Sequence, residues 1–581
     1  MQLKKDPAKA RVAVEFHVAP SGNDANDASA GSPLKTIQAA ANKAQPGDTV
    51  TVHAGTYREE INPPRGGDEG KPIVFQAAPG EKVVIKGSEI VTGWKKLEGD
   101  AWELTLPNSF FGKFNPYSDL IKGDWYEARQ KYHTGAVYLN GHWLKQAGVK
   151  SIVTGKGKAD QGPEELMNIL SLQVLGQKPV MAVKRSKQGS DAAVVEVPGG
   201  QPCLGRLKDG DWLEFDAVDF GEKGGKLILQ AASPNSGGIV EVREGSVDGR
   251  LLGKFLVAIT AEWTHFQGFR TPIETPLTGP QKIFLVFKSV PQPPVNENDP
   301  GFWFAEVDDK NTTIYAQFKD LDPNTRDTEI NVRQAVFYPR KTGRNYITVR
   351  GFTMMHAATN WAPPTAEQVG LIGTHWSKGW IIENNTISHS KCVGITLGKY
   401  GDEFNNKAAT ANAYNETIER ALKKGWNKET VGSHVVRKNK VSHCEQAGIV
   451  GSLGCIFSTV EGNEFRHIHT RKVFSGAEVA AIKFHAPIDM VIKDNLVRQS
   501  GGYGLLWLDW MAQGSRVSGN LFFDNLDQNV FMEVNHGPYL LDNNIFLGSA
   551  LRNWSQGGAY CYNILFGAIT VDPQARETPY H

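Results

Sequence analysis

A short apolar and polar pattern recurs along the second half of the chain, from about residue 345. Each unit alternates apolar and polar residues over a few positions, reaches an Asn, and returns to a further apolar segment, as in "MVIKDNLVRQSGGYGLLWL". Alternation with a period of two predicts a strand. The anchor positions are Asn463, Asn495, Asn520 and Asn544, which are separated by 32, 25 and 24 residues. A strand repeat with a period in the twenties predicts a β-solenoid, whose coils bury their apolar faces against one another.

The recurrent Asn residues and the N-terminal segment fit the same architecture. Asn side chains satisfy the backbone of turns, so we expect the anchors to stack at the bends of successive coils. Near the start of the chain, "LKTIQAAANKA" predicts an amphipathic helix after a Ser-Pro start, and "GDTVTVHAGTY" alternates as a strand. A helix at this place would cover the open strand edge of the solenoid.

The repeat is lost in the middle of the chain. Between about 170 and 295, short alternating strands are separated by Gly and Pro turns, which is typical of a β-sandwich. We therefore expect an all-β protein in which a right-handed parallel β-helix is interrupted by an inserted β-sandwich. The predicted divisions are an N-terminal cap with the first coils at 1–169, the sandwich at 170–295, and the main β-helix at 296–581.

Composition and charge limit the kinds of ligand that the protein binds and the compartments in which it is found. The 581 residues carry a net charge of +1, which argues against nucleic acid and strongly anionic polymers as partners. The five cysteines are scattered without a CxxC pair, so neither a disulfide framework nor a zinc site is expected. No apolar run is long enough to span a membrane, and the N-terminus lacks the hydrophobic core of a signal peptide. The protein is then cytoplasmic or a mature secreted form, and its oligomeric state cannot be read from these features.

Two acids lie one structural period apart in an apolar, aromatic run. Asp509 precedes Asn520 by 11 residues, and Glu533 precedes Asn544 by 11 residues. Matching positions of successive coils stack about 4.8 Å apart, so both carboxyl groups should lie side by side on the outer face. This separation fits a retaining glycosidase, in which one acid attacks the sugar and the other protonates the leaving oxygen. Two adjacent carboxyls also raise the pKa of one of the pair, which keeps that acid protonated near neutral pH.

The alternative hypothesis is that the two acids are solvated carboxylates on an exposed strand. The residues around them argue against it. Aromatic rings flank both acids and suit a sugar ring, in particular Trp507, Phe531, Trp510 and His536. We include Trp510 and His536 among the predicted substrate contacts.

Two resemblances to known families add to this interpretation. The Gly-Asp-Trp at 210–212, "GGIVEVRE", "DGRLLGKF" and "IFLVFK" resemble a carbohydrate-binding module of family 6. The segment departs from that family after "LVFKS", because "VPQPPVNENDPG" offers no clear final strand with the ligand-binding Asn. A structural calcium ion is compatible with such a module.

The longer motifs resemble glycoside hydrolase family 120, notably "GAEVAAIKFHAPIDM", "LLWLDWMAQGSRVSGNLF" and "FMEVNHGPYLLDNNI". The resemblance implies a β-helix interrupted by a sandwich and a retaining β-xylosidase activity. It assigns Asp509 as the nucleophile and Glu533 as the acid/base. It further implies that Glu478 and Trp125 hold the sugar, and the same motifs offer Trp361, His356 and His485 as further substrate contacts.

Two of these residues lie outside the regular repeat. Glu478 precedes Asn495 by 17 residues, so it does not stack under Asp509; counting back 11 residues gives Phe484, with Lys483 beside it. Trp125 comes from before the repeat region and would have to fold over the groove to act.

The leading hypothesis is an exo-acting glycosidase that releases xylose from β-1,4-xylo-oligosaccharides, with no cofactor required. The alternatives are a polysaccharide lyase, which would need a base such as Lys399 or Lys483, and a non-catalytic carbohydrate-binding protein. Fold alone does not choose among the three. The chain ends soon after a coil-like segment, and the family resemblance implies further coils in a longer protein.

Overall fold

The computed structural model describes residues 11–128, 130–154, 166–189, 192–197, 200–233, 238–257, 263, 266–288, 301–524, 530–547 and 551–573. Nearly all of "VPQPPVNENDPG" and the end of the chain therefore lie outside the described residues. Within these ranges, all five cysteines are free thiols. No helix in the same ranges has the length and apolar character needed to cross a membrane.

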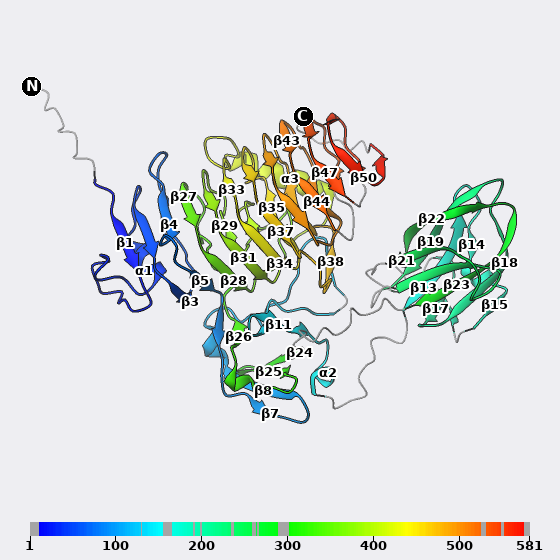
Figure 1. The fold of residues 1–581 in the computed structure, drawn as a ribbon, viewed down its shortest axis with the longest axis horizontal. Coiled ribbons are helices and arrows are strands. Elements are labelled where there is room, and N and C mark those ends of the chain that lie inside the picture. The colour runs from blue at the N-terminus through cyan, green and yellow to red at the C-terminus, as the bar shows by residue number, and fades with distance from the viewer. Residues whose placement is uncertain are drawn as a thin grey trace, which may run out of the picture.

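The main body is a parallel β-helix whose coils each contribute a strand to two or three long sheets (Figure 1). The first sheet has the order β1 (Glu15–Val18), β2 (Thr49–Val52), β4 (Ile73–Ala77), β27 (Ile347–Arg350), β30 (Ile381–Glu383), β33 (Val435–Arg437), β36 (Thr459–Glu461), β40 (Val491–Lys493), β43 (Ser515–Ser518), β46 (Tyr539–Asp542) and β49 (Gly558–Cys561). The second sheet has the order β3 (Gly55–Tyr57), β5 (Val83–Lys86), β28 (Thr353–Ala357), β31 (Thr386–Ser390), β34 (Lys440–Cys444), β37 (Glu464–Arg466), β41 (Leu496–Arg498), β44 (Leu521–Phe523), β47 (Ile545–Leu547) and β50 (Ile564–Phe566).

The third sheet of the β-helix carries the site described below. Its order is β29 (Ile372–Gly373), β32 (Val393–Thr396), β35 (Ala447–Ser452), β39 (Ala480–His485), β42 (Gly504–Asp509), β45 (Val530–Glu533), β48 (Leu551–Asn553) and β51 (Ile569–Val571). Alternate side chains of these strands point inward and join one continuous apolar core that runs through the coils. The predicted parallel β-helix is therefore confirmed.

The helices are few and short. They are α1 (Ile37–Lys43), α2 (Lys150–Thr154) and α3 (Ala411–Lys423), with single turns η1 (Asn108–Phe111), η2 (Ala182–Lys184) and η3 (Pro323–Thr325). The helix predicted near the N-terminus is α1, which begins where the Thr36 side chain accepts a hydrogen bond from the Ala39 amide. Its buried residues, which include Ile37 and Ala40, join the end of the solenoid core, as expected for a cap.

The anchor asparagines form a buried ladder along one bend of the β-helix. The Oδ1 of Asn495 accepts from the backbone N–H of Asn463 at 2.9 Å and from its side-chain amide at 3.0 Å. The Asn495 amide then donates to Asn520 Oδ1 at 2.9 Å and to a carbonyl of the preceding coil. The same pattern links Asn385, Asn439, Asn463, Asn495, Asn520, Asn544 and Asn563. The expected structural role of these residues is thus confirmed, because each satisfies the turn backbone of its neighbour.

Removing one rung should destabilise the β-helix. In Asn495→Ala the buried amide groups of Asn463 lose their acceptor, and we expect the free energy of unfolding to fall by roughly 2–4 kcal/mol. Denaturant unfolding of the variant measures this change. The matched control is Asn412→Ala, at an exposed position of α3, which should unfold like the parent. Equal stability of the two variants would contradict the role of the ladder.

A separate unit interrupts the β-helix between β5 and β28, and the sequence did not predict it. Its strands are β6 (Ser88–Ile90), β7 (Lys95–Lys96), β8 (Ala101–Pro107), β10 (Val137–Leu139), β11 (His142–Trp143), β12 (Lys145–Gln146), β24 (Phe302–Val307), β25 (Asn311–Gln317) and β26 (Thr328–Asn331). They form two small sheets around a core of their own that includes Trp303 and Ile314. The predicted divisions at 1–169 and 296–581 assign these strands to the β-helix, because alternation reveals a strand but not the sheet it joins.

The β-sandwich is in turn inserted within this unit. Its two antiparallel sheets enclose an independent apolar core (Figure 1). The strands are β13 (Met167–Val174), β14 (Val180–Met181), β15 (Lys187–Gln188), β16 (Ala193–Val195), β17 (Cys203–Leu207), β18 (Trp212–Asp219), β19 (Gly224–Ala232), β20 (Gly238–Glu244), β21 (Leu251–Val257), β22 (Gln267–Leu277) and β23 (Pro280–Lys288).

A buried ion cluster joins the inserted unit to the β-helix and contains His356, which the sequence analysis had placed at the substrate. Glu329 of β26 contacts Arg58 at 2.5 Å, Lys86 at 2.8 Å and His356 Nδ1 at 3.3 Å. The His356 ring is fully buried and stacks on Tyr138 with centroids 3.7 Å apart. The structure therefore places the His356 side chain in the interface between two domains, and His356 is not among the residues that line the pocket over the paired acids.

This cluster should make stability depend on pH. Burial opposes ionisation of Glu329, but hydrogen bonds and charges from His356 and Lys86 outweigh it and hold the pKa of Glu329 well below its usual range. A carboxyl with a lowered folded-state pKa stabilises fully above its unfolded pKa, about 4.3, and loses that contribution as pH falls further.

We therefore expect Glu329→Gln to destabilise the protein at pH 7 by about 3–5 kcal/mol, the usual cost of breaking a buried ion pair. The difference from the parent should shrink below pH 4. Denaturant unfolding at pH 7 and at acid pH tests this, and a difference that stays constant with pH would contradict the assignment.

Candidate active site

The two predicted acids lie on neighbouring strands of the third sheet and in the same register. Asp509 ends β42 and pairs directly with Glu533 at the end of β45. On the other side of Asp509, the paired position of β39 is His485. Leu508 and Met532 alternate with the acids and point into the core. The predicted side-by-side placement of the two acids on the outer face is confirmed.

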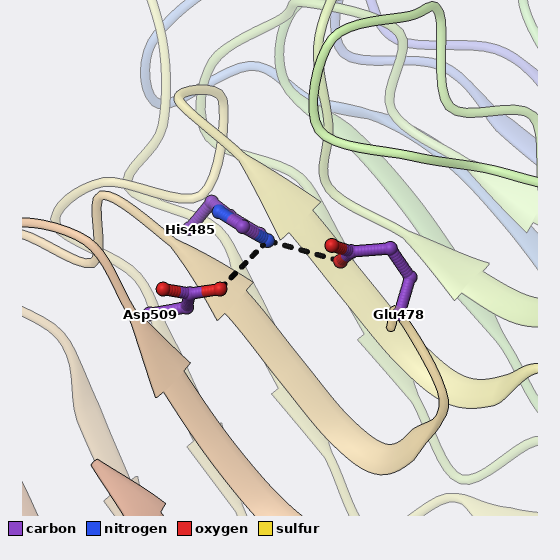
Figure 2. A group of neighbouring side chains, drawn as sticks. All are labelled: Glu478, His485 and Asp509. Carbon is purple, nitrogen blue, oxygen red and sulfur yellow. Dashed lines mark hydrogen bonds and ion pairs between the residues drawn. The ribbon is translucent and has the colours of Figure 1, made fainter. Parts of the chain in front are cut away.

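The position next to Asp509 differs from the one counted from the repeat. Counting 11 residues back from Asn495 gave Phe484, but Phe484 pairs with Leu508 in the core and His485 pairs with Asp509. The segment from His485 to Asn495 is 10 residues long, one fewer than the 11 residues from Asp509 to Asn520, so the count fails by one. Glu478 lies two residues before β39 begins, outside the register, as expected. Its side chain nevertheless reaches His485, as Figure 2 shows.

A pocket of about 280 Å³ opens over these residues. Its walls come from five separate segments of the chain. The lining residues are Trp125, Ala409, Thr410, Ala411, Tyr414, Ala477, Glu478, His485, Trp507, Asp509, Trp510 and Glu533. The structure thus brings together Asp509, Glu533 and four of the predicted substrate contacts.

Lys483 provides a buried positive charge next to two of the acids that line this pocket. Its side chain is 2% exposed, and its Nζ lies 2.8 Å from Asp509 Oδ2 and 3.5 Å from Glu478 Oε2. The same ammonium sits 3.0 Å from the centroid of the Trp507 ring. His485 Nε2 completes the group at 3.0 Å from Glu478 Oε2 and 3.4 Å from Asp509 Oδ2 (Figure 2). From the sequence, Lys483 is predicted only to be a base near the acids.

Glu478, His485 and Asp509 converge closely enough to hold a metal ion. The ammonium of Lys483, however, already lies within contact distance of both carboxylates. A divalent cation bound to the same oxygens would meet strong repulsion from this fixed charge. We therefore attribute the convergence to an ion-paired cluster.

The second acid has a different environment. Glu533 is half-buried, and its Oε2 accepts a hydrogen bond from the indole N–H of Trp507 at 3.2 Å. Arg552 of β48 lies close enough to interact electrostatically with Glu533. Its guanidinium stacks 3.5 Å from the ring centroid of Trp554. Trp507 therefore links the surroundings of the two acids. Its indole N–H donates to Glu533, and one face of its ring contacts Lys483, which is paired with Asp509.

Trp125 reaches the pocket on a segment that folds over the β-helix, as the sequence analysis required. β9 (Tyr126–Glu127) pairs with β38 (Ser475–Gly476), and the Trp125 carbonyl accepts from Ala477 N at 3.1 Å. The backbone of Trp125 has a φ of 60°, which is rare outside glycine. Gly476 permits this close approach, because a Cβ there would lie 2.4 Å from the Trp125 carbonyl oxygen.

Two other predicted contacts lie outside the pocket lining. Trp361 is buried under the Trp125 segment, where its indole N–H donates to the Asp124 carbonyl at 2.8 Å. It supports Trp125 from beneath and does not line the cavity. His536 is half-buried three residues after Glu533 and is also outside the lining. The predictions that Trp361 and His536 line the site are not supported by this geometry.

The sequence analysis missed the wall formed by α3 and the residues before it. Ala409, Thr410 and Tyr414 belong to a long insertion between β32 and β33, where the repeat gave no guidance. Tyr414 packs edge-on against His485 and Trp510. Burial raises the pKa of Tyr414 well above its usual value, with the charges of Asp509 and Glu478 adding to the effect. The break in the repeat between β32 and β33 was the feature of the sequence that could have predicted this wall.

Comparison with known proteins gives three matching family models. "Glycoside hydrolase 120, insertion domain" matches residues 91–167, which is the first part of the unit that interrupts the β-helix. "Carbohydrate binding module (family 6)" matches residues 184–302, which cover most of the β-sandwich. "Protein of unknown function (DUF1565)" matches residues 20–74 near the N-terminal cap.

Among solved structures, the complex of XylC with xylose is similar, with 35% identity and a TM-score of 0.66. The alignment covers 94% of this chain and 69% of the XylC chain. Among curated proteins, YwoF of Bacillus subtilis is 38% identical over 75 residues, which are 13% of this chain and 16% of that protein. An arabinoxylan arabinofuranohydrolase of Paenibacillus polymyxa is 35% identical over 81 residues, 14% of this chain and 13% of that protein. The chain spans between 13% and 20% of the length of the first curated relatives it matches.

A parallel β-helix with two carboxylates in register, and with this similarity along nearly its whole length, defines a glycoside hydrolase. The chain belongs to glycoside hydrolase family 120. A lyase would need a base, but both candidate lysines form ion pairs with acids. Lys483 is paired with Asp509, and Lys399 Nζ contacts Asp402 at 3.0 Å.

The position of Lys483 predicts that hydrolysis does not depend on a divalent metal. Dialysis against EDTA should leave the rate of aryl glycoside hydrolysis unchanged, because the ammonium already neutralises the converging carboxylates. The melting temperature is followed in parallel, since calcium bound elsewhere would alter stability without altering the rate. A rate that falls on dialysis and returns with an added divalent ion would contradict this assignment.

Proposed function

We propose that the protein is a retaining, exo-acting β-xylosidase that releases xylose from the non-reducing end of β-1,4-xylo-oligosaccharides. The observation that carries the proposal is the direct register of Asp509 and Glu533 on adjacent strands at the base of a small pocket. The reaction needs two carboxyl groups and no cofactor.

The spacing of strands supports a retaining mechanism. Adjacent strands lie about 4.8 Å apart, and carboxyl groups of retaining glycosidases are about 5–5.5 Å apart. Inverting enzymes hold their acids roughly 6.5–9.5 Å apart, to leave room for a water molecule. Two acids in direct register on neighbouring strands therefore favour double displacement.

The environments of the acids favour the same roles that the family resemblance implies. Asp509 is buried and contacts the Lys483 ammonium, which stabilises the ionised form that a nucleophile needs. Glu533 is more exposed and accepts from a neutral indole N–H, so it can exchange a proton with the leaving group and with water.

The two steps then proceed as follows. A carboxylate oxygen of Asp509 forms a bond to the anomeric carbon while the glycosidic bond breaks and the Glu533 proton passes to the leaving oxygen. In the second step Glu533 takes a proton from water, the water oxygen bonds to the anomeric carbon, and Asp509 leaves as a carboxylate. Each step inverts the anomeric centre, so the net outcome is retention.

The proposed substrate class and the proposed exo action are supported by the shape of the pocket and by one relative. XylC, with which the chain shares 35% identity, was solved in complex with xylose. The cavity volume of about 280 Å³ is at the small end of ligand sites. Walls from the Trp125 segment and from α3 close two sides, which favours one terminal sugar over a long internal stretch of polymer. Trp125 supplies an aromatic face for the ring, and Glu478 supplies acceptors for hydroxyl groups.

Substitution of the two acids tests the mechanism, with aryl β-xylosides as substrates and NMR to identify the first-formed anomer. The parent enzyme should release β-xylose first. Asp509→Ala should lose activity by several orders of magnitude, and added azide should yield the α-glycosyl azide, because the vacated face admits the anion. Glu533→Ala with azide should yield the β-glycosyl azide from the covalent intermediate and should lose least on substrates with activated leaving groups. Release of α-xylose as the first product would refute the retaining mechanism.

A further inference from the structure

The buried ammonium of Lys483 has a place in the reaction that neither acid supplies. Resting on the proposed double displacement, we propose that Lys483 is a positioning residue for both steps. It holds Asp509 ionised before attack, and it stabilises the Asp509 carboxylate again as that group leaves the covalent intermediate.

The geometry leaves little freedom to this side chain. Lys483 is on the central strand β39, and its outward direction is fixed by Ile482 and Phe484, which both join the core. Its ammonium contacts Asp509, Glu478 and the face of Trp507. An ammonium has three N–H donors, and these three neighbours can take all of them. Because the side chain is 2% exposed, water screens these contacts weakly.

The charges around Asp509 come from every element that packs on it. β39 contributes Lys483 and His485, the loop before β39 contributes Glu478, and β45 contributes Glu533. Further titratable groups nearby are Tyr414 of α3, whose raised pKa keeps the phenol neutral, and Arg552 of β48, which interacts electrostatically with Glu533. Lys483 is thus a cation in direct contact with Asp509.

The charge on Asp509 changes during the cycle while the charge on Lys483 does not. When the glycosyl ester forms, Asp509 becomes neutral, and the ammonium retains Glu478 as its partner at 3.5 Å. When the ester breaks, negative charge returns to an oxygen that lies next to a fixed cation. An interaction that strengthens toward the transition state accelerates that step. Lys483 should therefore assist the second step more than the first.

The test compares Lys483→Met, which removes the charge at similar length, with Lys483→Arg, which retains it. The control is Lys493→Met on β40, whose Nζ contacts Glu461 at 3.1 Å on a different sheet. Steady-state and stopped-flow kinetics are measured with a dinitrophenyl β-xyloside across pH, and circular dichroism checks the fold.

Lys483→Met should lower kcat by roughly ten- to a hundredfold, the range for a lost charged hydrogen bond. KM should fall with kcat, and a burst of dinitrophenolate should appear, because the covalent intermediate accumulates. The acidic limb of kcat/KM should move to higher pH, since Asp509 loses the charge that keeps it ionised. Lys483→Arg should restore the parental acidic limb and show a smaller loss of kcat. Lys493→Met should behave like the parent.

The inference is overturned if Lys483→Met shows no burst and an unmoved acidic limb while the parent retains configuration. If Lys483→Met does not fold, a shifted acidic limb in Lys483→Arg overturns it, because that variant keeps the charge. A parent enzyme that does not cleave β-xylosides, or that releases the α anomer first, would instead refute the proposed function, whatever the lysine variants do.

Discussion

The register between parallel strands is the constraint on which the rest of the structure depends. Each coil of the β-helix returns the chain to the same place one strand spacing further on, and the asparagine ladder fixes that return at the bends. A residue in one coil therefore meets its counterpart in the next at a distance set by backbone hydrogen bonds. Asp509 and Glu533 use this geometry, so the separation of two acids follows from the fold itself.

Electrostatics then distinguish two acids that the backbone places alike. Asp509 is buried beside an ammonium and an imidazole, whereas Glu533 is half-buried beside an indole N–H. The two carboxyl groups therefore have different partners, and a difference in environment is the usual condition for different roles of paired acids. Trp507 connects the two environments, because its ring carries Lys483 and its N–H meets Glu533.

Segments from outside the regular coils convert an open sheet into a pocket. The Trp125 segment crosses from the inserted unit, and the α3 insertion covers another side. Two residues determine the path of the Trp125 segment. Trp361 donates a hydrogen bond to the Asp124 carbonyl, and Gly476 permits the close approach of the Trp125 carbonyl. The buried cluster around Glu329 holds the inserted unit against the coils, so the stability of this interface also bears on the wall that Trp125 provides.

The sequence by itself determined the β-helix, the N-terminal cap, the sandwich and the register of the two acids, because all of these depend on local alternation and on a repeat. It also identified Glu478 and Trp125, though through the family resemblance and not through spacing. Tertiary structure decided what repeats cannot encode. The segment between β39 and its ladder asparagine is one residue shorter than the matching segment of the next coil, so His485 replaces Phe484 beside Asp509. His356 lies in a domain interface, and Trp361 supports the pocket from beneath. The α3 wall and the buried contacts of Lys483 arise where segments remote in sequence meet, and alternation along the chain carries no information about such meetings.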